Sequence, residues 1–302
     1  MNVCTVDGTV YCLRNDLAQV VLWYNKPLMD RFGYQVPKTW EEFQSLGQKV
    51  ATEHPGYTVG DVGDGYASEV YMWASKCPAN QITGAKAITV NTADPHCTKM
   101  ATLLDKLLQA KSMTAASVWG ADYLKNKASK VLMMPGPAWY GGALFQGTFK
   151  TPAGQLGVAP ALQWGDDPTP ATGNVGGGTW LLSSHSTHLK AAVDFMTWVT
   201  TADDYQGKAA PGFPAYNPAA ATWLAGQKSS GYYANDPTGP LTDAAPIVWS
   251  GWGAPQFSQE AIWAQTVIPG LTAGKTVTSL LPEWQEAITQ HARSNGYTVT
   301  SS

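Results

Sequence analysis

Two spacings of hydrophobic residues alternate along the chain. Continuous apolar runs at residues 20–24, 131–134 and 156–159 predict short buried strands. Between and after these runs, apolar residues three or four positions apart predict amphipathic helices. The clearest helical stripes are Trp40, Phe43, Leu46 and Val50; Leu103, Leu104, Leu107 and Leu108; Leu189, Ala192, Phe195 and Val199; and Leu280, Leu281, Trp284 and Ile288. Strands that alternate with helices in this way predict an α/β fold.

Local signals predict where several of these elements begin and end. Thr39 and Glu42 have the spacing of a capping box, in which each side chain satisfies the other's free backbone N–H, so a helix is expected to start there. Ser186 is expected to cap the helix of the third stripe. The strand at 131–134 is expected to break at the Pro-Gly-Pro of residues 135–137. Pro282 suits a first helical position, so the regular part of the last helix is expected to begin there.

Composition narrows the possible functions. The 302 residues allow a large core and suggest two lobes or domains. Only 14% of the residues are charged, where about 25% is typical, and 13 are tryptophan. The net charge of −3 leaves no basic surface, which argues against binding to nucleic acid. No apolar run reaches the roughly 18 residues that a membrane-spanning helix needs.

The four cysteines form two local pairs. A three-residue loop at 7–9 would place Cys4 opposite Cys12, within reach of a disulfide, and Cys77 could close a loop with Cys97. The spacing fits no zinc-ligand pattern, so disulfides in an oxidising, extracytoplasmic setting are expected. Four buried free thiols are the alternative. The chain has no signal peptide and opens directly in a hairpin, so we expect an N-terminal part to be absent from it.

No motif for catalysis or for phosphate binding is present. His185 and His188 lie three residues apart at a helix start without an evident third ligand, so a solvated helix cap is favoured and neither a metal site nor a cofactor is expected. Two carboxylates held roughly 5–10 Å apart could hydrolyse a glycoside. The candidates are Asp16, Asp61, Asp64, Glu69 and Glu260. A secreted carbohydrate-active hydrolase is therefore the alternative function.

The tryptophans divide by their surroundings. Six occupy stripe or strand positions and are predicted to be core residues: Trp23, Trp40, Trp198, Trp223, Trp263 and Trp284. Four lie close to Gly or Pro, on predicted loops or strand ends: Trp139, Trp180, Trp249 and Trp252. Aromatic rings on loops can stack on the apolar faces of sugar rings. They can equally fill gaps between lobes, and the sequence leaves both interpretations open.

An ordered series of short motifs runs through most of the chain. The motifs are DGTVY at 7–11, LWYNK at 22–26, PKTWEEF at 37–43, MPGPAW at 134–139, GGGTW at 176–180 and PGFPAY at 211–216. Each motif is weak, but their order and spacing resemble those of the extracellular solute-binding proteins of sugar ABC importers, the maltose-binding-protein-like family. The resemblance implies a periplasmic-binding-protein-like type II fold, with two α/β lobes joined by crossover strands.

The resemblance also implies boundaries for the two lobes. An incomplete N-terminal lobe would comprise residues 1–15 and 140–204, and the C-terminal lobe residues 26–134 and 205–302. The crossovers would lie near 16–25, 135–139 and 205–212. The first βα units of the N-terminal lobe, which supply ligand contacts in the family, would be absent.

Ligand-binding residues are carried over from the family at two crossovers, a loop of the C-terminal lobe, the glycine-run strand and the segment before a late helix. Trp139 matches its sugar-stacking tryptophan, although Ala138 is inserted before it. The other matching positions are Asp16, Gln19, Asp64, Tyr66, Gly177, Gly178, Trp249 and Trp252. The resemblance implies a monomeric, non-enzymatic receptor, free in the periplasm or lipid-anchored at the cell surface. Such a receptor binds a mono- or oligosaccharide and delivers it to the permease subunits of an ABC importer.

Overall fold

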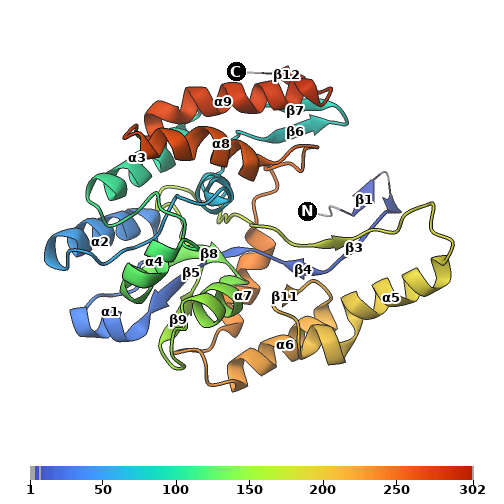
Figure 1. The fold of residues 1–302 in the computed structure, drawn as a ribbon, viewed down its shortest axis with the longest axis horizontal. Helices are drawn as coiled ribbons and strands as arrows, with labels where there is room; N and C mark the ends of the chain where they lie inside the picture. Colours follow the sequence, from blue (N-terminus) through green and yellow to red (C-terminus); the bar gives the residue numbers. More distant parts are fainter. Residues whose placement is uncertain (1–3, 7, 301–302) are drawn as a thin grey trace.

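The computed structural model describes residues 4–6 and 8–300. At its centre lies an antiparallel sheet in the order β8-β5-β9, formed by Met133–Pro137, Val20–Asn25 and Leu156–Ala159 (Figure 1). Successive side chains of a strand point to opposite faces, so Val20 and Leu22 enter one hydrophobic core while Val21 and Trp23 enter another. The strand expected from the apolar run at 20–24 therefore lies between the two cores and contributes side chains to both.

The larger core is enclosed by long helices and a second sheet. The helices are α1 (Lys26–Phe32), α2 (Trp40–Glu53), α3 (Pro95–Gln109), α8 (Gln259–Thr272) and α9 (Val277–Ser294). The second sheet has the order β12-β7-β6, formed by Thr298–Thr300, Ala87–Thr89 and Gln81–Gly84. Figure 1 shows α8 and α9 lying together beside this sheet. The capping box predicted for α2 is present, with Glu42 N–H donating to Thr39 Oγ1 over 3.1 Å.

The smaller core lies on the other face of β5. It is covered by α4 (Ala121–Asn126), the π-helical segment η3 (Gly141–Thr148), α6 (Asn217–Ser229) and α7 (Thr238–Ala244). Short turns η2 (Ala128–Lys130) and η5 (Ala245–Ile247) connect neighbouring elements. Trp223, predicted to be a core residue, is buried here.

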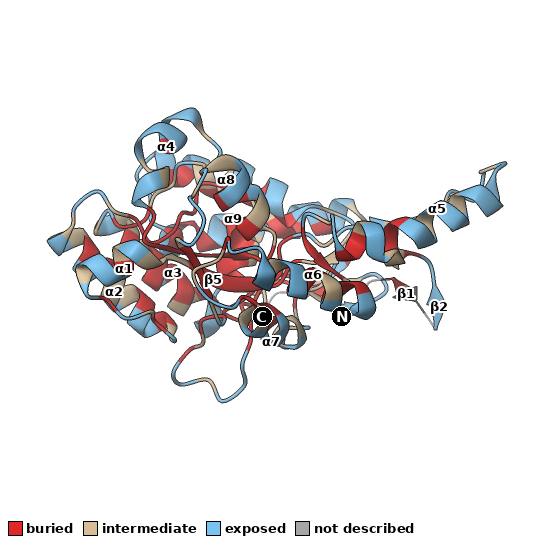
Figure 2. Ribbon diagram, turned by 90° about the horizontal axis from the view of Figure 1, so that it is seen from below, coloured by how far each residue is buried: buried red, intermediate tan, exposed pale blue. Residues whose placement is uncertain are grey.

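A thinner region extends away from the larger core and joins the smaller core through Phe213. It contains three strand pairs: β1 (Thr5–Val6) with β2 (Thr9–Val10), β3 (Leu13–Arg14) with β10 (Thr179–Trp180), and β4 (Asp16–Leu17) with β11 (Phe213–Pro214). It also contains α5 (Leu189–Thr201) and the π-helical turn η4 (Asp203–Gly207). In Figure 2, α5 projects from the buried body with most of its length exposed. We call β3, β10 and α5 together the α5 region.

The stripe predicted for α5 is largely uncovered. Leu189 and Phe195 are each 51% exposed, and only Val199 of that stripe is buried. Trp198, predicted to be a core residue, is 45% exposed. The prediction of a core position was wrong there because α5 packs chiefly against η4 and β3, which leave this face of the helix to solvent.

Three predicted boundaries also differ from the structure. The strand β8 does not break at residues 135–137 but runs through both prolines, because it is an edge strand, where a missing N–H is tolerated. Pro282 lies inside α9, which already starts at Val277 behind its N-cap Thr276. The helix α5 is preceded by His188, which makes no side-chain cap, and Ser186 Oγ instead accepts a bond from His188 N–H.

Both cysteine pairs are joined as disulfides, which leaves no free thiol among the four. In the first hairpin, Val6 pairs with Thr9, so the loop is one residue shorter than expected and Tyr11 N–H bonds to Cys4 O. Asp7 of that loop lies outside the described residues.

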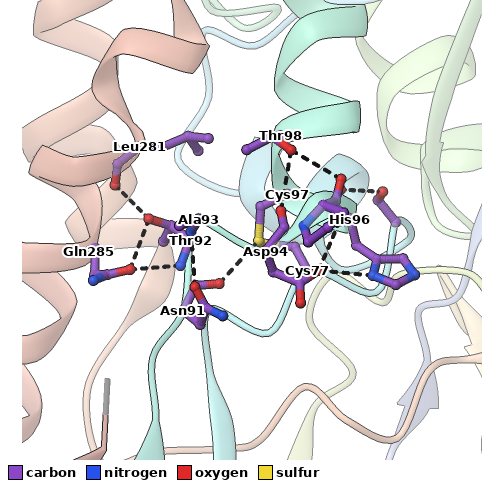
Figure 3. The surroundings of a disulfide bond; sticks show 12 residues. Cys77, Asn91, Thr92, Ala93, Asp94, His96, Cys97, Thr98, Leu281 and Gln285 are labelled. Atoms are coloured by element: carbon purple, nitrogen blue, oxygen red, sulfur yellow. Dashed lines mark hydrogen bonds and ion pairs between the residues drawn. A yellow bond between two sulfur atoms is a disulfide. The ribbon is translucent and has the colours of Figure 1, made fainter. Parts of the chain in front are cut away.

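The second disulfide links Cys77, which follows the π-helical turn η1 (Ser68–Met72), to Cys97 in the first turn of α3 (Figure 3). The segment between its two cysteines is tied to α9, because Thr92 Oγ1 donates to Leu281 O over 2.9 Å and Thr92 N–H donates to Gln285 Oε1 over 2.7 Å. Cys77–Cys97 therefore belongs to the larger core.

Candidate ligand-binding site

A cavity of about 640 Å³ opens where the π-helical turn η1 (Ser68–Met72), the 174–179 segment and the start of α8 meet. Trp73 and Trp252 line it with stacked rings, 5.4 Å apart and inclined by 10°. Trp73 Nε1 donates to Trp249 O over 2.7 Å, which fixes the orientation of the pair. Both rings are buried, Trp73 8% and Trp252 2% exposed, so the pair forms an apolar part of the cavity wall.

Side-chain amides supply polar groups to the same wall. Gln19 Nε2 donates to Leu241 O over 2.6 Å, and Gln259 Nε2 donates to Asn80 Oδ1 over 3.0 Å. Within the described residues, Oε1 of Gln19 and Oε1 of Gln259 have no hydrogen-bond donor. A buried acceptor without a partner costs about 1–3 kcal/mol. Both oxygens are therefore suited to accept a hydrogen bond from a ligand.

Two glutamates, Glu69 and Glu260, also line the cavity. Burial, the nearby charge of Glu260 and a hydrogen bond to it raise the pKa of Glu69 to about 8. Their carboxyl groups are in hydrogen-bond contact, whereas the carboxyls of a glycosidase flank the scissile bond at about 5 Å or more. The pair lacks the geometry that the hydrolase alternative requires.

The opposite wall is built on Arg14 and the glycine run. Arg14 Nε donates to Asp16 O over 3.3 Å, and burial lowers the pKa of Arg14 although the Asp16 charge opposes this. Gly178 N–H donates to Asp16 Oδ1 over 2.7 Å. Gly177 has a φ of +92°, and a Cβ there would lie 2.9 Å from Arg14 Nη2. Glycine is thus needed at position 177 both for its backbone conformation and for this close approach.

A second group of aromatic residues lies behind the 174–177 segment. Trp139 Nε1 donates to Val175 O over 2.9 Å, and its ring stacks on Trp119 with centroids 6.4 Å apart. Trp119 Nε1 in turn donates to the Tyr66 hydroxyl over 2.7 Å. Trp119 is 37% exposed, so this group reaches the surface. We call Tyr66, Trp119, Trp139 and Tyr140 the aromatic cluster.

Asp64 is buried beside the aromatic cluster and is occupied by local bonds. Its carboxylate accepts bonds from the Ser117 hydroxyl over 2.5 Å and from Val118 N–H over 3.0 Å. Burial and the charge of Asp64 raise the pKa of the neighbouring Asp61 well above its usual range. These effects favour the neutral form of Asp61, whereas Asp64 provides the acceptor for the 117–118 turn.

The structure distributes the residues selected from the sequence over two places. Gln19, Gly177 and Trp252 line the cavity, and Asp16 and Gly178 lie directly behind its wall. The remaining positions lie outside the lining: Asp64, Tyr66 and Trp139 at the aromatic cluster, and Trp249 next to Trp73.

Several lining residues were missed in the sequence. They are Arg14, Trp73, Asn80, Asn174 and Gln259, together with Glu69 and Glu260, which were considered only for catalysis. Their residue types suit sugar binding, but nothing in the local sequence indicates that they meet.

Comparison with known proteins identifies the family. The model of the bacterial extracellular solute-binding protein family matches residues 13–206. The chain belongs to this family. Its members are receptors that bind solutes rather than enzymes, so the chain is a solute receptor. None of the curated proteins compared with the chain matches it. Among the described residues, no helix is long and apolar enough to cross a membrane.

Solved structures of other binding proteins share the fold. The ABC transporter associated binding protein from B. animalis subsp. lactis Bl-04, in complex with β-1,6-galactobiose, is 22% identical with a TM-score of 0.83, over 98% of this chain and 77% of that one. The galacto-N-biose-/lacto-N-biose I-binding protein from Bifidobacterium longum, in complex with lacto-N-biose, is 18% identical with a TM-score of 0.74, over 98% and 74%. The sugar-binding protein MalE from Xanthomonas citri is 15% identical with a TM-score of 0.65, over 96% and 73%.

Proposed function

We propose that this solute receptor is extracytoplasmic, binds a mono- or oligosaccharide, and delivers it to the permease subunits of an ABC importer. The cavity carries the proposal, because it combines the stacked indoles of Trp73 and Trp252 with the amide oxygens of Gln19 and Gln259, which have no partner among the described residues. Sugar rings offer apolar faces to aromatic rings and hydroxyl donors to such oxygens. The sugars bound by structures of the same fold support the same class of ligand.

Binding would draw together two lobes of a type II periplasmic-binding-protein-like fold. The crossover candidates 16–25 and 135–139 lie side by side, since Ala138 N–H donates to Gln19 O over 2.9 Å. Rotation about such connections is a common way of closing a cleft on its ligand. By the family resemblance, Trp139, Asp64 and Tyr66 would contact the ligand in the closed form, which a permease would recognise, and this requires Asp64 to release the 117–118 turn.

Calorimetry against a saccharide panel tests the proposal. The panel contains β-1,6-galactobiose, lacto-N-biose, maltose and maltotriose, with an amino acid and a dipeptide as controls. We expect at least one saccharide, and neither control, to bind with micromolar affinity. Failure of every saccharide to bind would remove the proposal.

A matched pair of variants tests the role of the aromatic cluster. Trp139→Ala is expected to lower affinity at least tenfold with little change in melting temperature. Trp180→Ala, whose ring packs on Phe195 in the α5 region, should leave affinity unchanged. A large loss of stability in Trp139→Ala at unchanged affinity would show that Trp139 only fills space.

A further inference from the structure

The two glutamates of the cavity are brought together from separate parts of the chain. Glu69 lies in η1 and Glu260 lies in the first turn of α8. Two glycines allow the backbones that carry them to pack closely. A Cβ at Gly65 would lie 2.7 Å from Glu260 O, and a Cβ at Gly173 would collide with Glu69 O. The pair is therefore held by tight backbone packing.

The surroundings of the two carboxyl groups differ. Glu260 is exposed, and the N-terminus of α8, capped by Ser258, favours its negative charge. Oε2 of Glu69 is buried and has no donor to bond with in the described part of the chain. Two carboxylates in contact do not both ionise readily, so a proton on Glu69, which it can donate to Glu260, is favoured. This agrees with the pKa of about 8 for Glu69.

Among the described residues, Glu260 is the one titratable group that acts on the Glu69 carboxyl group. The elements packed against η1 are α3, α8 and β8. β8 carries no titratable side chain, α8 carries only Glu260, and α3 carries His96, Lys99, Asp105 and Lys106. Of these groups, only Glu260 acts on Glu69. The charged residues of the described cavity lining are Arg14, Glu69 and Glu260. With one proton on the pair, Glu260 and Arg14 carry opposite charges in the lining, and Asp16 behind it lies beside Arg14, so little charge remains uncompensated, which suits a neutral ligand.

The nearby amides point to the same kind of ligand. Gln19 and Gln259 are almost completely buried, and each has a side-chain oxygen without a donor among the described residues. Together with the Glu260 carboxylate, the cavity offers three groups that accept hydrogen bonds. A ligand rich in hydroxyl groups supplies the donors that these acceptors need.

We propose that Glu69 and Glu260 form the hydroxyl-binding subsite of this cavity and keep one shared proton when a neutral saccharide binds. The proposal rests on the saccharide function proposed above. A saccharide that fills the cavity displaces water from the pair, which further disfavours a second negative charge. Binding above about pH 8 therefore takes up a proton, and affinity falls by up to about tenfold for each further pH unit.

Calorimetry across the titration of the pair tests this coupling. The probe is the tightest-binding neutral disaccharide of the panel, measured from about pH 6 to about pH 10 in buffers of different ionisation heats. Wild type should show the fall in affinity and proton uptake approaching one per ligand at high pH. Both should disappear in Glu69→Gln. In Glu260→Gln, which removes a charge and a hydrogen bond but not the burial that raises the pKa of Glu69, the fall in affinity should begin at lower pH. Glu286→Gln, an exposed acid on α9, should keep the wild-type profile.

The outcomes separate the two proposals. Saccharide binding that is independent of pH, without proton uptake, overturns the subsite and leaves the saccharide function standing. Absence of binding to every saccharide overturns both. Infrared spectroscopy adds a readout without ligand: at neutral pH, the protonated carboxylic acid absorption of wild type should exceed that of Glu69→Gln, because Asp61 contributes to both proteins and Glu69 only to wild type. Identical carboxyl bands in the two proteins would show that Glu69 carries no proton.

Discussion

The helices α9 and α5 have similar hydrophobic stripes but different surroundings. In α9 the stripe of Leu280, Leu281, Trp284 and Ile288 is buried against α3 and α8. In α5 the corresponding stripe is mostly exposed (Figure 2). Apolar spacing therefore shows which face of a helix can be buried, but not whether another part of the described chain covers it. The four predictions below test whether substitutions at buried positions lower the free energy of unfolding more than substitutions at exposed positions.

The largest effect is expected for Trp284→Ala in α9. Trp284 is fully buried and packs edge-on against Trp263, with ring centroids 5.2 Å apart. Removing a buried indole leaves a cavity, so the free energy of unfolding should fall by about 3–5 kcal/mol. Urea unfolding followed by circular dichroism measures this change. A loss below about 1 kcal/mol would mean that the core around α9 tolerates cavities.

The two disulfides extend the comparison, because Cys77–Cys97 lies in the larger core whereas Cys4–Cys12 closes the β1–β2 hairpin of the thinner region. Replacing Cys77 and Cys97 by Ala releases a connection across 20 residues and should destabilise the larger core by about 3 kcal/mol. Replacing Cys4 and Cys12 should change the main unfolding transition by less than about 1 kcal/mol, because a short hairpin can open without the cores. Scanning calorimetry of both double variants compares them. Equal losses would show that the hairpin unfolds together with the cores.

Replacing a buried acid should lower the free energy of unfolding more than replacing an exposed acid. Asp64→Asn replaces one carboxylate oxygen by an NH₂ group, which cannot accept the hydrogen bond that Asp64 now receives from the Ser117 hydroxyl or from Val118 N–H. The free energy of unfolding is therefore expected to fall by about 2 kcal/mol. Asp194→Asn in α5 removes only an exposed ion pair with Lys190 and should cost about 0.5 kcal/mol or less. Asp61→Asn is the matched buried control, because the raised pKa of Asp61 favours its neutral form. Thermal melts at neutral pH should therefore rank Asp64→Asn lowest.

The smallest effect is expected for Trp198→Ala in α5. The ring is 45% exposed and mainly stacks on Tyr205, 5.5 Å away. Its loss should change the free energy of unfolding by about 0.5 kcal/mol or less. Urea unfolding beside Trp284→Ala measures the contrast directly. If the two substitutions lower the free energy of unfolding equally, the exposed face of α5 must be covered in solution.

Features determined by neighbouring residues were predictable from the sequence. The capping box of Thr39 and Glu42 and the strand β5 follow from local patterns, and both are present. The break expected at Pro135 was wrong, because a proline is tolerated in a strand that turns out to lie at a sheet edge. Whether a strand is central or at an edge depends on distant pairing, which local patterns do not contain.

The candidate site was less predictable for a similar reason. Gln19, Gly177 and Trp252 were selected from the family resemblance, and the structure places them in the cavity lining. The contact between Trp73 and Trp252 joins η1 to the segment before α8, and a single sequence gives no information about such long-range pairs.

The membership of β5 in both cores has a consequence for how the protein opens. Neither core can come apart without exposing one face of this strand, so loosening either core should loosen the other. Backbone amides of Leu22 and Trp23, held between β8 and β9, should therefore exchange with deuterium only when the whole body unfolds. Through this single strand, the two cores should behave as one cooperative unit.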